Sequence, residues 1–170
     1  YYHLVEGLRD PLKDKPRIWL TLGGVQRQRG GNVRMWPVTV PMLRWATWRF
    51  WQATDDEYVV YAAAVVAWFF ALRGGECSAV PGQGWLAQRV VTGHDVTPRA
   101  HGVVVAGFGE ADEVVLYIKG SKTDQYNAGN VRNHYRSESE LCPVRALAEL
   151  QRRFPGRFGR GAEVGLPLFR

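Results

Sequence analysis

The most constraining feature of the sequence is a long apolar run that ends in charge. Every residue from Tyr58 to Leu72 is apolar or a tyrosine, and the run is followed by Arg73 and, three residues later, Glu76. A helix that is apolar on all sides has to be buried, so the run predicts a central helix. Thr54 and Glu57 stand before it at the spacing of a capping box, which predicts where this helix begins.

The same run argues against a membrane protein. It is shorter than the roughly 20 residues that a helix needs to cross a bilayer, and no signal peptide precedes it. With 170 residues and 46% hydrophobic content, the chain is long enough to bury the core of one domain. We therefore expect an intracellular protein without a membrane partner, located in the nucleus if its source is eukaryotic.

The charge balance points to a polyanionic partner. Lysine and arginine number 22 against 16 acidic residues, a formal net charge of +6, which favours nucleic acid over an acidic membrane. Common catalytic motifs are absent: the sequence has no GxSxG, P-loop or HExxH. The two cysteines, Cys77 and Cys142, stand far apart without a CxxC motif or a Cys/His cluster, so the sequence does not suggest a zinc site.

The order of patterns predicts an α+β fold, mainly helical with a small three-stranded antiparallel sheet. Thr39 and Pro41 open a first helix. It carries a tryptophan stripe of Met42, Trp45, Trp48 and Trp51, for which a packed core face is favoured over a base-stacking platform. Gly74 and Gly75 are expected to end the buried helix at Leu72. A short helix at 76–80, a loop at 83–100, strands at 102–106, 113–118 and 130–135, and a last helix to residue 153 complete the prediction.

Arg73 admits two interpretations from the residues alone. A salt bridge to Glu76, one helical turn away, is slightly favoured. The alternative is a guanidinium that holds a phosphate through paired hydrogen bonds. Lys119 and Lys122 lie on an expected hairpin tip, either as solvated turn residues or as lysines that reach the same phosphate and donate a proton.

The order of several segments favours the second interpretation, in which Arg73 binds a phosphate. Leu72-Arg73-Gly74-Gly75-Glu76 has the form R-x-x-E after an apolar helix, and Ser121-Lys122-Thr123-Asp124-Gln125 is a lysine-bearing hairpin. A linker at 24–39, a polar segment at 94–96 and a helix start at 141–147 complete the order. From about residue 24 to 170 the layout resembles the catalytic domain of tyrosine recombinases, the phage-integrase-like DNA strand-exchange enzymes, and more closely their eukaryotic, retroelement-type or transposon-borne members.

This resemblance implies a mechanism and a set of site residues. A tyrosine of the intact parent would attack a phosphate of double-stranded DNA and form a 3′-phosphotyrosyl intermediate, with no metal or cofactor. Arg73 would stabilise the developing charge, and Lys122, with Lys119 as the alternative, would protonate the leaving oxygen. Glu76 would be a structural partner of Arg73. Further DNA-binding residues, in the basic linker, would be Arg27, Arg29 and Arg34.

The sequence also departs from the family. No histidine is followed by arginine at the third position, because Glu6, Thr97, Val104 and Ser137 stand there, and no tyrosine occupies the nucleophile's place near the C-terminus. We therefore expect residues 1–36 to be the end of an N-terminal helical DNA-binding region with a basic linker. Residues 37–170 would form a C-terminally truncated catalytic domain that works as a homo-oligomer on DNA in its parent. The alternatives are a non-catalytic basic DNA-binding remnant and a basic helical interaction module.

Overall fold

The computed structural model describes residues 38–50, 54–77, 89–119 and 128–170. All of them belong to the second of two units into which the chain divides, Asn32–Arg170, while the first unit, Tyr1–Gly31, lies outside the described residues. Four predicted DNA-contacting residues also lie outside them, namely Arg27, Arg29, Arg34 and Lys122.

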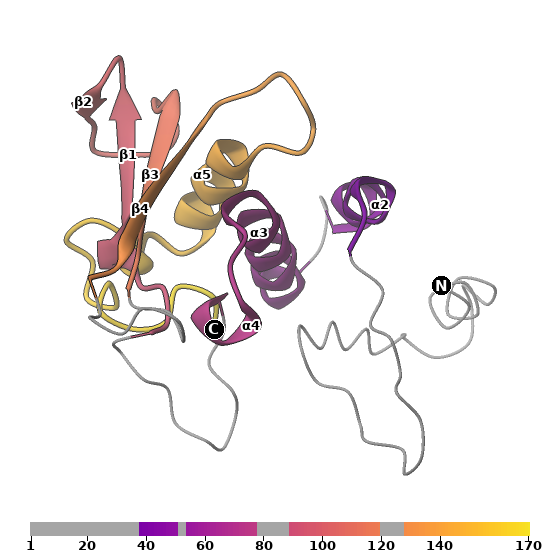
Figure 1. The fold of residues 1–170 in the computed structure, drawn as a ribbon, viewed down its shortest axis with the longest axis horizontal. Coiled ribbons are helices and arrows are strands. Elements are labelled where there is room, and N and C mark those ends of the chain that lie inside the picture. The colour runs from indigo at the N-terminus through magenta and orange to yellow at the C-terminus, as the bar shows by residue number, and fades with distance from the viewer. Residues whose placement is uncertain (1–37, 51–53, 78–88, 120–127) are drawn as a thin grey trace, which may run out of the picture. The chain divides into compact units, whose positions relative to one another are not determined.

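The described part of the second unit has an α+β fold, as predicted. Helices and an antiparallel sheet both contribute, and the sheet has four strands in the order β2-β1-β3-β4 (Figure 1). The helices are α2 (Val40–Phe50), α3 (Asp55–Phe70), α4 (Gly74–Cys77) and α5 (Pro143–Arg153), with 3₁₀ turns η1 (Gly93–Asp95) and η2 (Pro155–Arg157); the strands are β1 (Val96–Ala100), β2 (Val103–Val104), β3 (Glu113–Ile118) and β4 (Asn130–Tyr135).

The prediction of three strands was wrong because β1 lies in a segment that we expected to be a loop. Pro98 interrupts β1 and lacks the N–H that a central strand normally uses. The N–H of Arg136 donates to the carbonyl of Asp112. Hydrogen-bonded pairs recur at every second residue of an antiparallel ladder, so the backbone groups of Val114 also point towards β4. Pro98, which is opposite Val114, therefore faces away from β3, and its carbonyl accepts from Val105 at 3.1 Å. The missing N–H consequently costs no hydrogen bond to β3.

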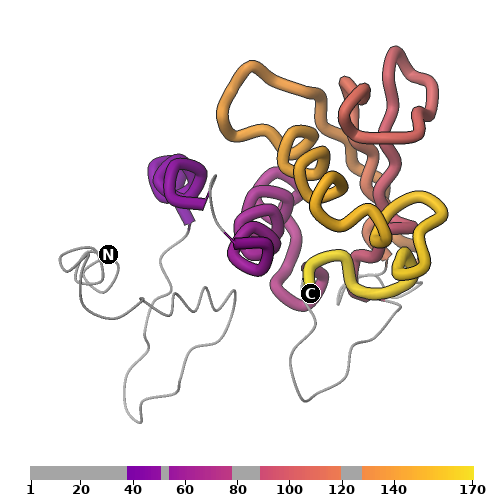
Figure 2. The backbone as a smooth tube through the Cα atoms, turned by 180° about the vertical axis from the view of Figure 1, so that it is seen from behind, coloured from indigo at the N-terminus to yellow at the C-terminus, as the bar shows by residue number. Residues whose placement is uncertain are grey.

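The helices form a layer against one face of the sheet. α5 packs on β3 and β4, α3 packs on α5, and α2 packs on α3 (Figure 2). The inner face of β3 contributes Val114, Leu116 and Ile118 to the core, because side chains alternate along a strand. The largest fully buried side chains are Tyr58, Phe70, Phe108, Leu116, Leu147, Leu150 and Leu168.

The tryptophan stripe of α2 is not the core face that we expected. Trp48 is 80% exposed, and Trp45 is only partly buried. The buried positions of α2 are instead Leu43, Ala46, Thr47 and Phe50, at the i, i+3, i+4, i+7 spacing of one helix face. The face of α2 that packs into the core is therefore next to the tryptophan stripe and does not coincide with it.

The capping box that begins α3 is confirmed. The Thr54 hydroxyl accepts from the Glu57 N–H, and the Glu57 carboxylate accepts from the Thr54 N–H at 3.2 Å. The end of α3 differs from the prediction, because Ala71 takes a left-handed conformation with φ of 50° and the Leu72 N–H returns to Ala67 at 2.9 Å. The helix thus ends at Phe70, before the glycine pair, and α4 begins at Gly74 instead of Glu76.

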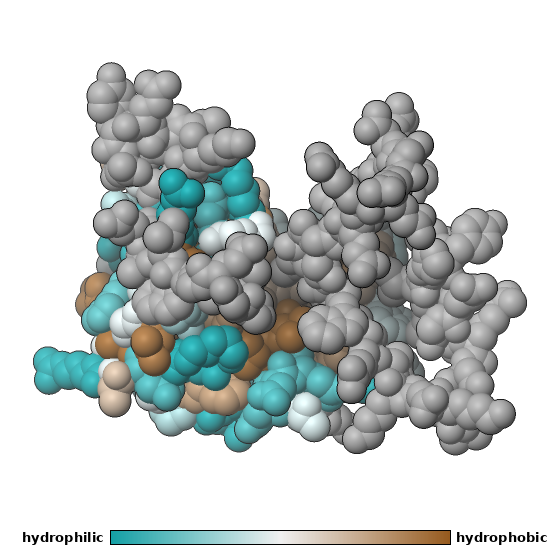
Figure 3. Space-filling model, turned by 90° about the horizontal axis from the view of Figure 1, so that it is seen from below, coloured by the Kyte–Doolittle hydropathy of each residue, from teal (hydrophilic) through white to brown (hydrophobic). Residues whose placement is uncertain are grey.

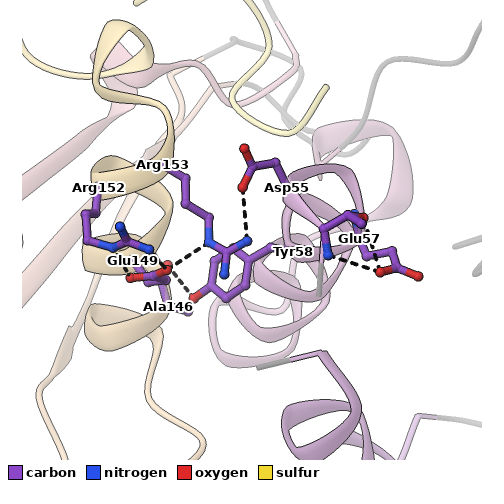
Figure 4. Close-up of polar contacts among 8 residues, drawn as sticks. Asp55, Glu57, Tyr58, Ala146, Glu149, Arg152 and Arg153 are labelled. Atoms are coloured by element: carbon purple, nitrogen blue, oxygen red, sulfur yellow. Dashed lines mark hydrogen bonds and ion pairs between the residues drawn. The ribbon is translucent and has the colours of Figure 1, made fainter. Parts of the chain in front are cut away.

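An arginine of α5 joins the two central helices. The guanidinium of Arg153 lies 4.3 Å from the centre of the Tyr58 ring and bonds to Asp55 at 3.1 Å and Glu149 at 2.8 Å (Figure 4). The Tyr58 hydroxyl donates to the carbonyl of Ala146 at 3.3 Å. A cation over an aromatic ring is favourable where both are shielded from water, so this cluster stabilises the α3–α5 contact.

The cluster also predicts an acid dependence of stability. The hydrogen bond from Arg152 and, against the opposing effect of burial, that from Arg153 lower the pKa of Glu149 from 4.5 to about 2. A lowered folded-state pKa gives stability that is present above the unfolded value of 4.5 and is lost as pH falls towards 2. Because the side chain of Arg152, the stronger partner, is 70% exposed and water screens its attraction, we expect a contribution of about 1 kcal/mol.

Chemical unfolding of the wild type and of Glu149→Gln at about pH 6 and about pH 2 measures the stability that the Glu149 carboxylate contributes. The wild type should be more stable than the variant at the higher pH. The difference should shrink at about pH 2, since about half of the Glu149 side chains are then protonated even in the folded state. The same difference at both pH values would contradict the prediction.

Candidate functional site

Arg73 stands at the turn between α3 and α4, where its backbone is fixed and its side chain is half exposed. The Arg73 N–H donates to Glu76 Oε2 at 2.9 Å, and the Arg73 carbonyl accepts from the N–H of Glu76 at 2.8 Å and of Cys77 at 3.1 Å. Arg73 Nη1 lies 3.7 Å from Glu76 Oε1, while its side chain stays 55% exposed. Such an open, loosely paired contact contributes little to stability and leaves the guanidinium accessible to an anion.

Two side chains of β4 hold the end of α3 beside this turn. Arg132 Nη1 donates to the carbonyl of Phe70, and His134 Nε2 lies 2.6 Å from the carbonyl of Phe69. Basic groups are favourable at a helix C-terminus, where carbonyls lack intrahelical partners. Sequence analysis missed this role. The signal for it is the position of both residues on the inner face of β4, opposite Leu116 and Val114.

Lys119 lies at the end of β3 in a shielded ion pair. Its Nζ is 2.7 Å from Oδ2 of Asp95, which is 5% exposed. The same oxygen accepts from the N–H of Thr92 at 2.8 Å and from its hydroxyl at 2.7 Å. A buried carboxylate needs such a full set of donors. Lys119 therefore joins the base of the hairpin to η1. Sequence analysis placed Asp95 only in the polar segment at 94–96 and did not predict its contact with Lys119.

The short segment of Val91 and Thr92 connects the parts of the site. The Val91 N–H donates to the carbonyl of Glu76 at 2.9 Å, and the Val91 carbonyl accepts from Leu168 at 2.9 Å. Thr92 pairs with Pro167 as an isolated bridge and bonds to Lys119 at 3.4 Å. The end of β3 and the start of β4 consequently lie at the same end of the sheet as α4 and the C-terminal segment (Figure 1).

The structure thus brings two of the predicted site residues to one end of the fold. Arg73 and Lys119 are joined through Glu76, Val91 and Thr92. Seen from this end, the described surface mixes hydrophilic and hydrophobic residues (Figure 3). Lys122 and the linker arginines lie outside the described residues, so their positions stay predictions.

A separate cleft lies beside the first half of α3, at Tyr58 and Tyr61. It has a volume of about 790 Å³ and is lined by α2, α3 and the start of α5. Its walls carry basic, acidic and aromatic side chains, among them Trp48, Arg49, Tyr61, Glu140 and Arg145. None of the site residues that the structure describes, Arg73, Glu76 and Lys119, lines it, so the cleft is distinct from the Arg73 site.

The described residues offer little for redox or metal chemistry. Among them, no three His, Cys, Asp or Glu side chains gather closely enough to hold a metal ion. Burial raises the pKa of the Cys77 thiol to about 12, so Cys77 stays a neutral thiol whose Sγ donates to the Ala63 carbonyl. Within the described ranges, every helix is too short or too polar to cross a bilayer. Comparison with family models, curated proteins and solved structures finds no match for this chain.

Proposed function

We propose that the chain is a DNA-binding part of a site-specific tyrosine recombinase or integrase catalytic domain. In the intact parent this domain would exchange DNA strands through a 3′-phosphotyrosyl intermediate. The observation that carries the proposal is the joint position of Arg73 and the hairpin. Arg73 is held half exposed on a capped turn, while Arg132 and Lys119, at the bases of the two hairpin strands, are attached to the same end of the fold.

The geometry supports distinct roles for the two arginines and the two lysines. Arg132 is occupied by the end of α3, so Arg73 is the arginine with a guanidinium open to a phosphate. Lys119 is held by a buried carboxylate, which suits a residue that fixes the base of the hairpin. We therefore propose Lys122 as the hairpin lysine that reaches the phosphate and donates a proton to the leaving oxygen.

A non-catalytic DNA-binding remnant is the second candidate, because the sequence lacks an H-x-x-R motif and a tyrosine at the nucleophile's place. Both candidates bind duplex DNA, and they differ in the parent protein. A parent that carries both missing motifs and forms a covalent adduct at a DNA 3′-phosphate supports the recombinase. A parent without either motif supports the remnant.

Replacing Arg73 with alanine should weaken binding to duplex DNA about tenfold. A charge-assisted hydrogen bond to phosphate contributes about 1.5 kcal/mol, which corresponds to that factor. The slope of log affinity against log salt should also fall by about one unit, since one fewer counterion is released. Fluorescence anisotropy with a labelled duplex at several salt concentrations measures both effects.

Arg44→Ala is the matched control for this experiment. The Arg44 side chain is 62% exposed and has one carboxylate partner, Glu140, at 3.2 Å, so the substitution removes the same charge from a similar environment on α2. It should change the affinity by less than about twofold. Equal losses for the two variants would indicate only a general effect of charge. No duplex binding by the wild type at low salt would refute the proposed function.

A further inference from the structure

The outer edge of β4 has unused backbone hydrogen-bonding groups. β4 is the last strand of the sheet, and its pairing with β3 alternates so that residues 130, 132 and 134 direct their backbone groups to β3. Val131, Asn133 and Tyr135 therefore turn their N–H and C=O groups outwards. In the described part of the chain, no backbone hydrogen bond reaches these groups.

The side chains along this edge do not protect it. Val131 is 60% exposed and Tyr135 is 67% exposed, and both lie with Asn133 on the solvent face of the sheet. The basic residues of the strand, Arg132 and His134, are turned to the other face, where they hold the end of α3. Natural edge strands are usually blocked by an outward charge, a proline or a bulge. β4 has no proline and no outward charge along Val131, Asn133 and Tyr135.

We propose that β4 pairs with β4 of a second copy of this chain to form an antiparallel, two-fold symmetric dimer. The symmetric register places Asn133 opposite Asn133 of the second copy. It then places Val131 opposite Tyr135 of the second copy, and Tyr135 opposite Val131. All three residues exchange both of their outward backbone hydrogen bonds in this register, and the two sheets become one continuous sheet.

The sequence of the strand favours its own copy as the occupant. An aromatic residue opposite a β-branched one is a favourable cross-strand pair, and this register makes the pair twice. Asn133 uses its Nδ2 to donate to Glu113 at 2.6 Å, so its amide oxygen stays available to the facing asparagine. The chain carries a net charge of +6, so copies repel one another in general. On the solvent face the edge is neutral, so two copies meet there without placing like charges opposite each other. On the inner face Arg132 lies opposite His134 of the second copy, where both side chains are engaged by the carbonyls that end α3.

Sedimentation of the whole chain without DNA tests the dimer, and its outcome is independent of the proposed DNA binding. We expect the mass to rise from one chain to two as concentration increases. Val131→Lys should weaken the dimer at least about tenfold, because it removes the β-branched side chain that packs on Tyr135 of the second copy and puts a charge on the edge, which blocks strand pairing. Val103→Lys is the matched control, since Val103 is 67% exposed on β2 at the opposite edge, and it should leave the dimer unchanged.

Disulfide crosslinking tests the register directly. Residues directly opposite each other have Cα atoms about 5.5 Å apart, which a disulfide can bridge. The variant with Val131→Cys and Tyr135→Cys should form crosslinked dimers on oxidation. Val131→Cys alone should not, because the two copies of residue 131 lie about 13 Å apart in this register. The native cysteines, Cys77 and Cys142, are buried in both copies.

Each outcome bears on the proposal. A dimer weakened by Val131→Lys but not by Val103→Lys, with crosslinking only in the double-cysteine variant, supports it. A single-chain mass at every concentration refutes it, as does a dimer that Val131→Lys leaves intact. Crosslinking of Val131→Cys alone also refutes it, because that result requires a different register.

Discussion

Replacing Tyr58 with alanine is expected to lower the free energy of unfolding by about 4 kcal/mol, the range measured for large-to-small substitutions of buried aromatic residues. Tyr58 is 1% exposed and lies in the contact between α3 and α5. Its ring lies under the guanidinium of Arg153 and contacts Tyr61 at 5.5 Å between ring centres. The substitution removes these contacts and leaves a cavity. Chemical denaturation followed by circular dichroism measures the loss.

Tyr58→Phe is the control, because it keeps the ring and removes only the hydroxyl. That hydroxyl donates to the carbonyl of Ala146, and one neutral hydrogen bond contributes about 1 kcal/mol. We therefore expect the phenylalanine variant to retain most of the stability and the packing of Arg153. Equal losses for the two variants would show that the hydroxyl, and not the ring, stabilises the α3–α5 contact.

Replacing Asp95 with alanine is expected to cost about 3 kcal/mol, because it leaves several partners of a buried carboxylate unsatisfied. The N–H and hydroxyl of Thr92 lose their acceptor, and Lys119 loses its ion pair. The substitution should also destabilise the segment of Val91 and Thr92, which connects the parts of the site. Hydrogen exchange should therefore become faster at the amides of Val91 and Thr92, in addition to the global loss measured by denaturation.

Asp112→Ala is the matched control for Asp95→Ala. Asp112 is also an aspartate that accepts from a backbone N–H, that of His101 at 3.0 Å, but its side chain is 43% exposed. We expect this substitution to cost about 1 kcal/mol or less, since water replaces the lost partner. If the two substitutions cost the same, the buried cluster at Asp95 contributes no more than a surface contact.

Local patterns predicted several elements correctly. The start of α3 was predictable because Thr54 and Glu57 form a capping box within four residues of chain. Burial of most of α3 followed from its composition, but burial on all sides was wrong, because Val60 and Trp68 are 39% and 40% exposed. Its end was predicted too late, because glycine normally takes the left-handed position that closes a helix, and here Ala71 takes it.

β1 was missed for a physical reason that involves its neighbours. Its sequence, Val-Thr-Pro-Arg-Ala, lacks the alternation of a strand and contains Pro98. Only the pairing with β2 and β3 shows that the missing N–H of Pro98 points away from β3. The exposure of Trp48 has a similar origin, since the packing of α2 on α3 selects which face of the helix is buried.

For the candidate site, spacing along the chain was enough to predict contacts between residues that are close together in the sequence. Arg73 and Glu76 are one helical turn apart, so their contact was foreseeable, and the order of motifs around them led to the proposed function. The contacts of Lys119 with Asp95 and of Arg132 with the end of α3 were not predictable from these patterns and are seen only in the folded chain. These contacts join residues far apart in sequence. Their formation depends on strand register and helix packing, which short sequence patterns do not specify.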